Sequence, residues 1–131
     1  PHRMAPDDLQ MFLTIDARVH RDRRCSNAEQ LKTLIESTGV EFPDAHAGSD
    51  GVPFNLPVLL PPSTDRARFM GSLSEQRVFA SALWPDCEFD PMPCPLAECY
   101  RDRLIVLPVD QRFGQADINQ IANSFVACRL N

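Results

Sequence analysis

Twelve prolines limit where this 131-residue chain can form regular structure. Four of them fall between Trp84 and Tyr100, and this density predicts a long irregular segment on the surface. The adjacent prolines Pro61 and Pro62 end the apolar run from Phe54 to Leu60, which is typical of a short buried strand. Proline cannot donate a backbone hydrogen bond to a sheet, so Pro57 inside this run predicts an edge strand.

Apolar residues at helical spacing near the start of the chain predict helical structure between Pro6 and Gly39. Ser26 and Glu29 have the spacing of a capping box, which would begin a second helix inside this region. The sequence therefore leaves one long helix or two as alternatives over residues 1–38. The two apolar stripes are formed by Leu9, Phe12, Ile15 and Val19, and by Ala28, Leu31, Leu34 and Ile35.

The remaining pattern predicts a small α+β unit over residues 39–131. Glu41–Pro53 is rich in turn residues, Ser63 begins a helix, and Arg77–Leu83 and Arg103–Val109 have the composition of strands. Gly114 begins a last helix whose apolar stripe ends at Val126. We expect one domain with a small, mainly antiparallel sheet of about three strands and helices packed on one face.

Composition excludes several classes of protein. A net charge of −5 argues against general nucleic-acid binding, which depends on neutralising phosphates. No run approaches the roughly 18 apolar residues of a membrane span. The first residues lack the apolar region of a secretion signal, so we expect a cytoplasmic protein. The five cysteines include no Cys-x-x-Cys pair, and we expect free thiols and no metal site.

Two residues are candidates for binding. Trp84 could stack on a substrate, although we favour a role in covering the end of the sheet. Arg112 could reach a phosphate or carboxylate with its planar guanidinium, although pairing with Asp110 is the favoured alternative. The histidines have no nucleophile or carboxylate constellation around them, so we expect no catalytic residue. The basic residues at positions 18, 20, 21, 23 and 24 predict a solvated helix face or a face that pairs with another domain.

Four segments resemble a known family in the right order along the chain. Leu107–Gly114, with the sequence LPVDQRFG, resembles the segment before the final helix of DegT-type aminotransferases. Val52–Leu59 is similar to the family's first small-domain strand, and Ala82–Pro85 to its His-Trp-Pro step. Arg23–Ala28 resembles the long helix that links the two domains of these enzymes. The chain thus resembles the family's carboxy-terminal small domain, with Pro85, Asp110 and Gln111 as structural residues of its motifs.

The resemblance implies a role within a larger enzyme. Family members use pyridoxal phosphate (PLP) to transaminate keto sugars attached to nucleotides, and a lysine of the large domain forms the Schiff base. Lys32 is the only lysine here, and Leu83 stands where the family often has histidine. The resemblance therefore implies a domain without a cofactor of its own, inactive alone, that closes the cleft and supports the dimer.

The partner implied by the resemblance is the large PLP-binding domain or a second copy of the chain. The alternative is a free-standing, non-catalytic module for binding or oligomerisation. A small domain separated from its large domain should expose an apolar patch at the former contact, whereas a free-standing module should not.

Overall fold

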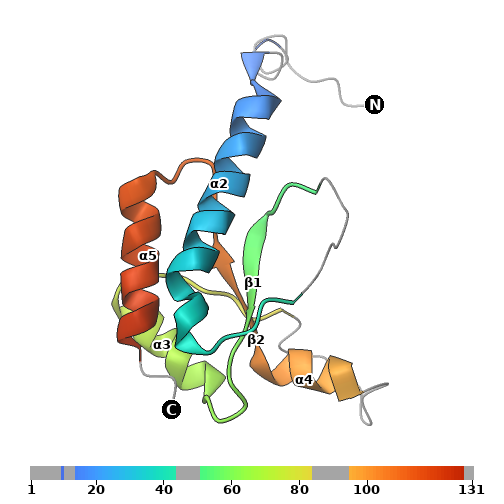
Figure 1. Cartoon of the computed structure of the whole chain (residues 1–131), viewed down its shortest axis with the longest axis vertical. Coiled ribbons are helices and arrows are strands. Elements are labelled where there is room, and N and C mark those ends of the chain that lie inside the picture. The colour runs from blue at the N-terminus through green and yellow to red at the C-terminus, as the bar shows by residue number, and fades with distance from the viewer. Residues whose placement is uncertain (1–9, 11–13, 44–50, 84–94, 129–131) are drawn as a thin grey trace.

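The computed structural model describes residue 10 and residues 14–43, 51–83 and 95–128. In this part of the chain, four α-helices accompany a two-stranded antiparallel sheet, which confirms the predicted α+β class (Figure 1). The elements in chain order are α2 (Ala17–Ile35), the short 3₁₀ helix η1 (Glu36–Thr38), β1 (Asn55–Leu59), α3 (Arg66–Glu75), α4 (Pro95–Arg103), β2 (Leu104–Pro108) and α5 (Gln115–Ala127).

The amino-terminal region forms one long helix rather than two from residue 17 onward. Asp16 caps α2, because its Oδ1 atom accepts hydrogen bonds from the backbone N–H groups of Arg18 at 3.0 Å and Val19 at 3.3 Å. The helix then continues through Ser26, so the predicted capping box does not begin a second helix. Gly39 ends the region in a left-handed conformation with a φ of 83°, as its position in the sequence predicts.

The sheet pairs β1 with β2 from Asn55↔Pro108 to Leu59↔Leu104, close to the two predicted strands. Val106, opposite Pro57, exchanges both its backbone hydrogen bonds with Ser81, at 2.8 and 3.1 Å. Val106 therefore requires no backbone hydrogen bond from Pro57, which has no N–H to donate. The expectation that this proline lies at an edge is confirmed.

The predicted third strand, Arg77–Leu83, is reduced to the single bridge between Ser81 and Val106. The physical reason lies at the end of α3. The N–H of Arg77 donates to the carbonyl of Ser74 at 2.9 Å, and that of Val78 to Leu73 at 3.0 Å. These two bonds form a Schellman motif, which commits the start of the segment to ending the helix. The expected sheet of about three strands is therefore slightly too large.

The prediction of an irregular segment from Trp84 to Tyr100 is wrong over its last six residues. Pro95 is the first residue of α4, a position where proline is tolerated because its missing N–H would have no helical partner. Glu98 in the first turn and Arg101 and Arg103 in the last turn have the charges that the helix dipole favours. Residues 84–94 lie outside the described part of the chain.

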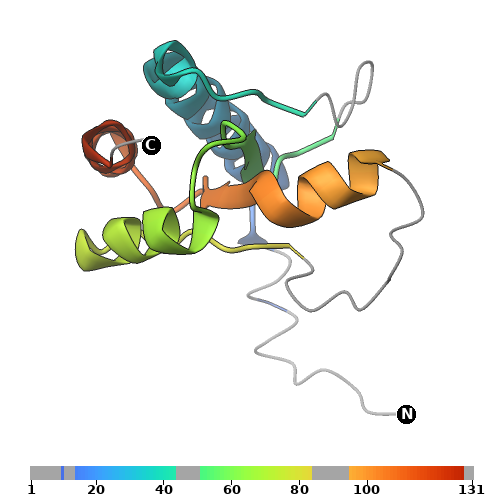
Figure 2. The ribbon, with the colours of Figure 1, turned by 90° about the horizontal axis from the view of Figure 1, so that it is seen from below.

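The core lies on one face of the sheet, against α2, α3 and α5. Alternate residues of the strand regions point into it, and Phe69 of α3 meets Phe125 of α5 edge to face, with ring centroids 5.0 Å apart. These three helices pack on one face of the sheet, as predicted, and Figure 2 shows α4 set apart from them. The strands and the residues directly after them contribute Leu56, Val58, Leu60, Ile105, Leu107 and Val109 to the core, and the helix residues include Ala28, Leu31, Ile35, Leu73, Ile118, Ile121 and Ala122.

The buried stripes of the helices are narrower than the sequence predicts. Leu34 of α2 is 41% exposed and Val126 of α5 is 55% exposed. In the amino-terminal stripe, Ile15 and Val19 are also exposed, at 52% and 62%. Only the carboxy-terminal half of α2 therefore contributes to the core.

Candidate functional site

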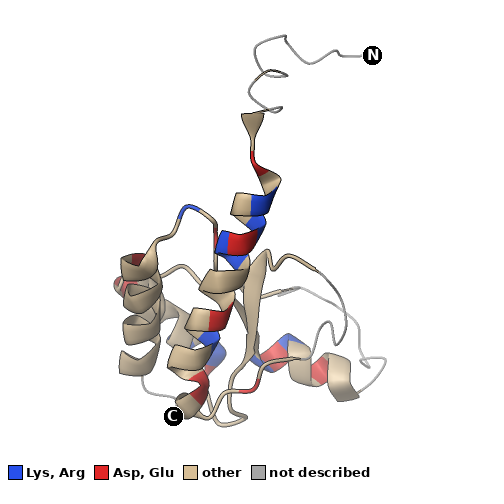
Figure 3. Ribbon diagram, turned by 45° about the horizontal axis from the view of Figure 1, so that its top comes forward, with Lys and Arg blue, Asp and Glu red and all other residues tan. Residues whose placement is uncertain are grey.

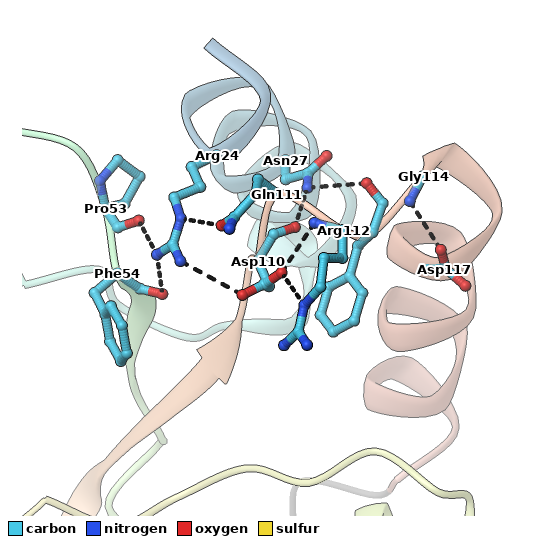
Figure 4. Close-up of polar contacts among 10 residues, drawn as sticks. Arg24, Asn27, Pro53, Phe54, Asp110, Gln111, Arg112, Gly114 and Asp117 are labelled. Carbon is cyan, nitrogen blue, oxygen red and sulfur yellow. Dashed lines mark hydrogen bonds and ion pairs between the residues drawn. The ribbon is translucent and has the colours of Figure 1, made fainter. Parts of the chain in front are cut away.

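Three of the four segments singled out in the sequence meet in space. Arg24 on α2 donates from Nε to Oε1 of Gln111 at 2.6 Å, and its Nη2 lies 3.4 Å from Oδ2 of Asp110. Asn27, one turn further along the same helix, donates from Nδ2 to the carbonyl oxygens of Asp110 at 2.9 Å and Phe113 at 3.3 Å. We call this contact between α2 and the β2–α5 connection the α2 joint (Figure 4).

Arg24 also reaches a third part of the chain. Its Nη1 atom lies 3.4 Å from the carbonyl oxygens of both Pro53 and Phe54, and its guanidinium stands 5.2 Å from the centroid of the Phe54 ring. The Arg24 side chain is only 16% exposed. A charge so removed from water needs polar partners, and Arg24 has an amide oxygen and a carboxylate in the joint and two carbonyl oxygens beside it.

Asp110 is shared between two arginines. Its Oδ1 atom accepts from the backbone N–H of Arg112 at 2.9 Å and from Arg112 Nε at 2.7 Å, while Oδ2 faces Arg24. These hydrogen bonds from Arg112, first from its side chain and then from its backbone, hold the pKa of Asp110 below its ordinary value of 3.8, with a smaller contribution from the charge of Arg24.

Arg112 lies largely in solvent, with 81% of its side chain exposed. Pairing with Asp110 raises the pKa of Arg112 above its ordinary value, so the group stays charged. Figure 4 shows its two outer nitrogen atoms pointing away from Asp110. The guanidinium is therefore held at Nε, and its outer edge is free to meet an anion.

The other sequence candidates are placed as follows. Trp84 and Pro85 lie outside the described residues. Of the basic cluster, Arg18, His20, Arg21 and Arg23 are exposed, and Arg24 is the member that contacts the β2–α5 connection. Figure 3 shows basic and acidic positions interspersed along the projecting half of α2. The thiols of Cys25 and Cys99 are free and half-buried. Cys128 is free and buried, and burial raises its pKa.

An apolar hollow of about 570 Å³ lies on the sheet face opposite the core. Pro57, Leu104 and Val106 form part of its floor, and Tyr100 and Phe54 line it from α4 and from the entry to β1. Phe54 is 76% exposed. Sequence reasoning missed this hollow. The unbroken apolar run of β2 was a signal that both faces of the strand are apolar, and in the structure four consecutive residues of the strand are buried.

The lysine and the possible metal ligands among the described residues are the groups that bear on a cofactor. Lys32, the only lysine, projects from the exposed side of α2, and its Nζ atom stands 5.4 Å from the centroid of the Phe42 ring. Within the described ranges, no group of three histidine, cysteine or acidic side chains is placed to hold a metal ion. No helix formed by the described residues is both long and apolar enough to cross a membrane.

No protein-family model and no curated protein matches the sequence. Solved structures do match the fold. A DegT DnrJ EryC1 StrS aminotransferase from Brucella abortus is 14% identical with a TM-score of 0.71, and the match covers 92% of this chain and 33% of that one. The aminotransferase TlmJ from Streptoalloteichus hindustanus is 19% identical with a TM-score of 0.68, over 82% of this chain and 31% of that one.

The sugar aminotransferase CalS13 from Micromonospora echinospora is similar to the same degree. It is 16% identical with a TM-score of 0.67, and the match covers 92% of this chain and 33% of that one. The chain thus has the fold of a domain of sugar aminotransferases of the DegT/DnrJ/EryC1/StrS type, and it spans about a third of the length of these structures.

Proposed function

We propose that this chain serves as the carboxy-terminal small domain of a PLP-dependent aminotransferase that acts on nucleotide-linked keto sugars in the cytoplasm. The observation that carries the proposal is the agreement in fold with such enzymes over nearly all of this chain and about a third of theirs. In this role the domain closes one side of the active-site cleft and supports the dimer.

The open sheet face supports a partner domain. The hollow is apolar, and Phe54 and Val52 beside it are 76% and 44% exposed. Clustered exposed apolar side chains of this kind mark contact surfaces more often than isolated ones do. A domain made to pack against a larger one has a reason to keep this surface, whereas a free-standing monomer has none.

Arg112 is the described residue best suited to face the cleft. Its guanidinium is already oriented by Asp110, and its outer edge has the geometry to bind a carboxylate or phosphate of a substrate. Trp84 stays a second candidate for contact with the substrate, and we assign Pro85, Asp110 and Gln111 to the structural support of the two motifs.

The chain does not transaminate by itself in this proposal. The reaction needs a lysine that can bond to the cofactor and carry a proton at the reacting carbon. Lys32 extends over Phe42 on the outer side of α2. We therefore assign the cofactor, its phosphate site and the reactive lysine to the large domain.

The test is the intact mass of the protein in the cells that produce it. The proposal predicts a species well above 14.7 kDa, with a lysine-bearing domain ahead of Pro1, and PLP absorbance in that purified species. Mature protein of 14.7 kDa, free of any covalently joined larger domain, would contradict the proposal and favour a free-standing module.

A further inference from the structure

Arg24 stands where α2 leaves the body of the domain. On its carboxy-terminal side, Asn27, Ala28, Leu31 and Ile35 are buried. On its amino-terminal side, every residue from Thr14 to Arg23 is exposed, and the helix projects beyond the sheet (Figure 1). Arg24 is therefore the outermost anchored residue of the helix.

The partners of Arg24 belong to one end of the sheet. Asn55 pairs with Pro108 at the last rung, where β1 begins and β2 ends. Pro53 and Phe54 come just before that rung on one strand, and Asp110 and Gln111 come just after it on the other. One guanidinium thus bridges both strands at the end of the sheet and fixes α2 against them. Its partners lie 29 to 87 residues away in the sequence.

We propose that Arg24 is a positioning residue that sets the direction of the projecting segment of α2, residues 17–23, relative to the sheet. Through its contacts with Phe54 it also holds the rim of the apolar hollow. The proposal deepens the proposed function, because a domain preceding α2 takes its orientation from this segment. It nevertheless concerns the 131-residue chain alone.

Positive charge is not enough for this role. The planar guanidinium donates to Gln111 from Nε and to Asp110 and two carbonyl groups from its outer nitrogen atoms, and it faces the Phe54 ring. A lysine ammonium is a single point of charge and cannot make this set of contacts at once. Arg24→Lys therefore separates geometry from charge, and Arg23→Lys is a matched control one residue away on the exposed side.

The experiment measures residual dipolar couplings and ¹⁵N relaxation on the labelled 131-residue chain. In the unmodified chain and in Arg23→Lys, couplings from residues 17–23 should fit the same alignment tensor as those from β1 and β2. In Arg24→Lys the residues 17–23 should no longer fit that tensor, and their order parameters should fall from about 0.85 toward about 0.6. Couplings within α5 should still fit that tensor. A general loss of structure would instead disturb the core, and the couplings of α5 with it.

Two results would overturn the proposal. One is an unchanged fit for residues 17–23 in Arg24→Lys, and the other is an equal disturbance in Arg23→Lys. If Arg24→Lys does not fold, Gln111→Ala removes the acceptor at 2.6 Å while keeping Arg24, and unchanged couplings in that variant would reject the proposal. A mature mass of 14.7 kDa would contradict the proposed function without touching this result, so the two can fail separately.

Discussion

The two faces of the sheet are both apolar, but among the described residues α2, α3 and α5 cover only one of them, and α4 borders the other. Ile105, Leu107 and Val109 point to the side where α2, α3 and α5 form the core. Leu104 and Val106 point to the other side, where they line the hollow. The comparison teaches that an apolar sequence alone does not show whether a surface is buried within its own chain. Equally hydrophobic residues can form part of a core or part of a contact with another domain.

Truncating one phenylalanine on each face tests the comparison most strongly. Phe125 is fully buried against Phe69, so Phe125→Ala should lower the free energy of unfolding by about 3–5 kcal/mol, measured by urea denaturation. Phe54 is 76% exposed, and Phe54→Ala should cost no more than about 0.5 kcal/mol. Similar losses for both variants would show that the open face contributes to the chain's own stability, and the contrast between the faces would fail.

Asn27 tests the polar part of the covered side. It is 2% exposed and donates to two carbonyl oxygens, so Asn27→Asp replaces a donor with an oxygen that repels both. We expect a loss of about 1–3 kcal/mol at pH 7. Burial should raise the pKa of the new carboxyl above its unfolded value, so the loss should shrink as the pH falls and the acid becomes a donor. Denaturation at pH 7 and pH 4 measures this, and a loss that grows toward pH 4 would contradict it.

Arg77 lies where the chain passes from α3 toward the open face. Its φ of 62° is left-handed, a conformation that costs a side-chain-bearing residue about 1–2 kcal/mol and costs glycine little. Arg77→Gly should therefore raise the free energy of unfolding by about 0.5–1 kcal/mol in thermal or chemical denaturation. Arg77→Ala is the control, because it removes the same side chain and keeps the strain. An equal gain in both variants would show that the side chain, and not the backbone, is the cause.

Asp110 should give the smallest effect, because it lies at the end of the sheet between the two faces. Its pKa is depressed in the folded chain, so its contribution to stability is present above the unfolded pKa near 3.8 and is lost as the pH falls through the folded pKa. Asp110→Asn should be less stable than the unmodified chain at pH 7, and this difference should vanish in strong acid. Comparison of melting temperatures from pH 7 to pH 2 measures it, and a constant difference would exclude the ionised carboxylate as the cause.

Much of the covered side could be predicted from the sequence. The stripe of α5, the two paired strands and the glycine stop after α2 follow from local periodicity and turn chemistry, and each lies close to its predicted place. The resemblance of LPVDQRFG to a family motif also pointed to the correct fold.

The features that could not be predicted arise where composition is compatible with two structures, or where a partner is distant in sequence. The segment Arg77–Leu83 has strand composition, but its first two backbone N–H groups donate to carbonyl oxygens at the end of α3. Arg24 looks like the other arginines of its cluster until the fold brings Gln111 within 2.6 Å. Pro95 reads as a breaker in a proline-rich run, although proline also suits the first turn of a helix. Local composition alone does not distinguish between the alternatives in any of these three cases.

The contact between α2 and α5 has a consequence for the order of events during synthesis. About 80 residues separate the end of α2 from the start of α5. At about 5–20 residues per second, roughly 4–16 s pass before synthesis of the last helix even begins, and only that helix completes the cover over the buried side of the first one. Leu31 and Ile35 therefore emerge from the ribosome well before α5, and chaperone contact in that interval would fall on the region that becomes the core.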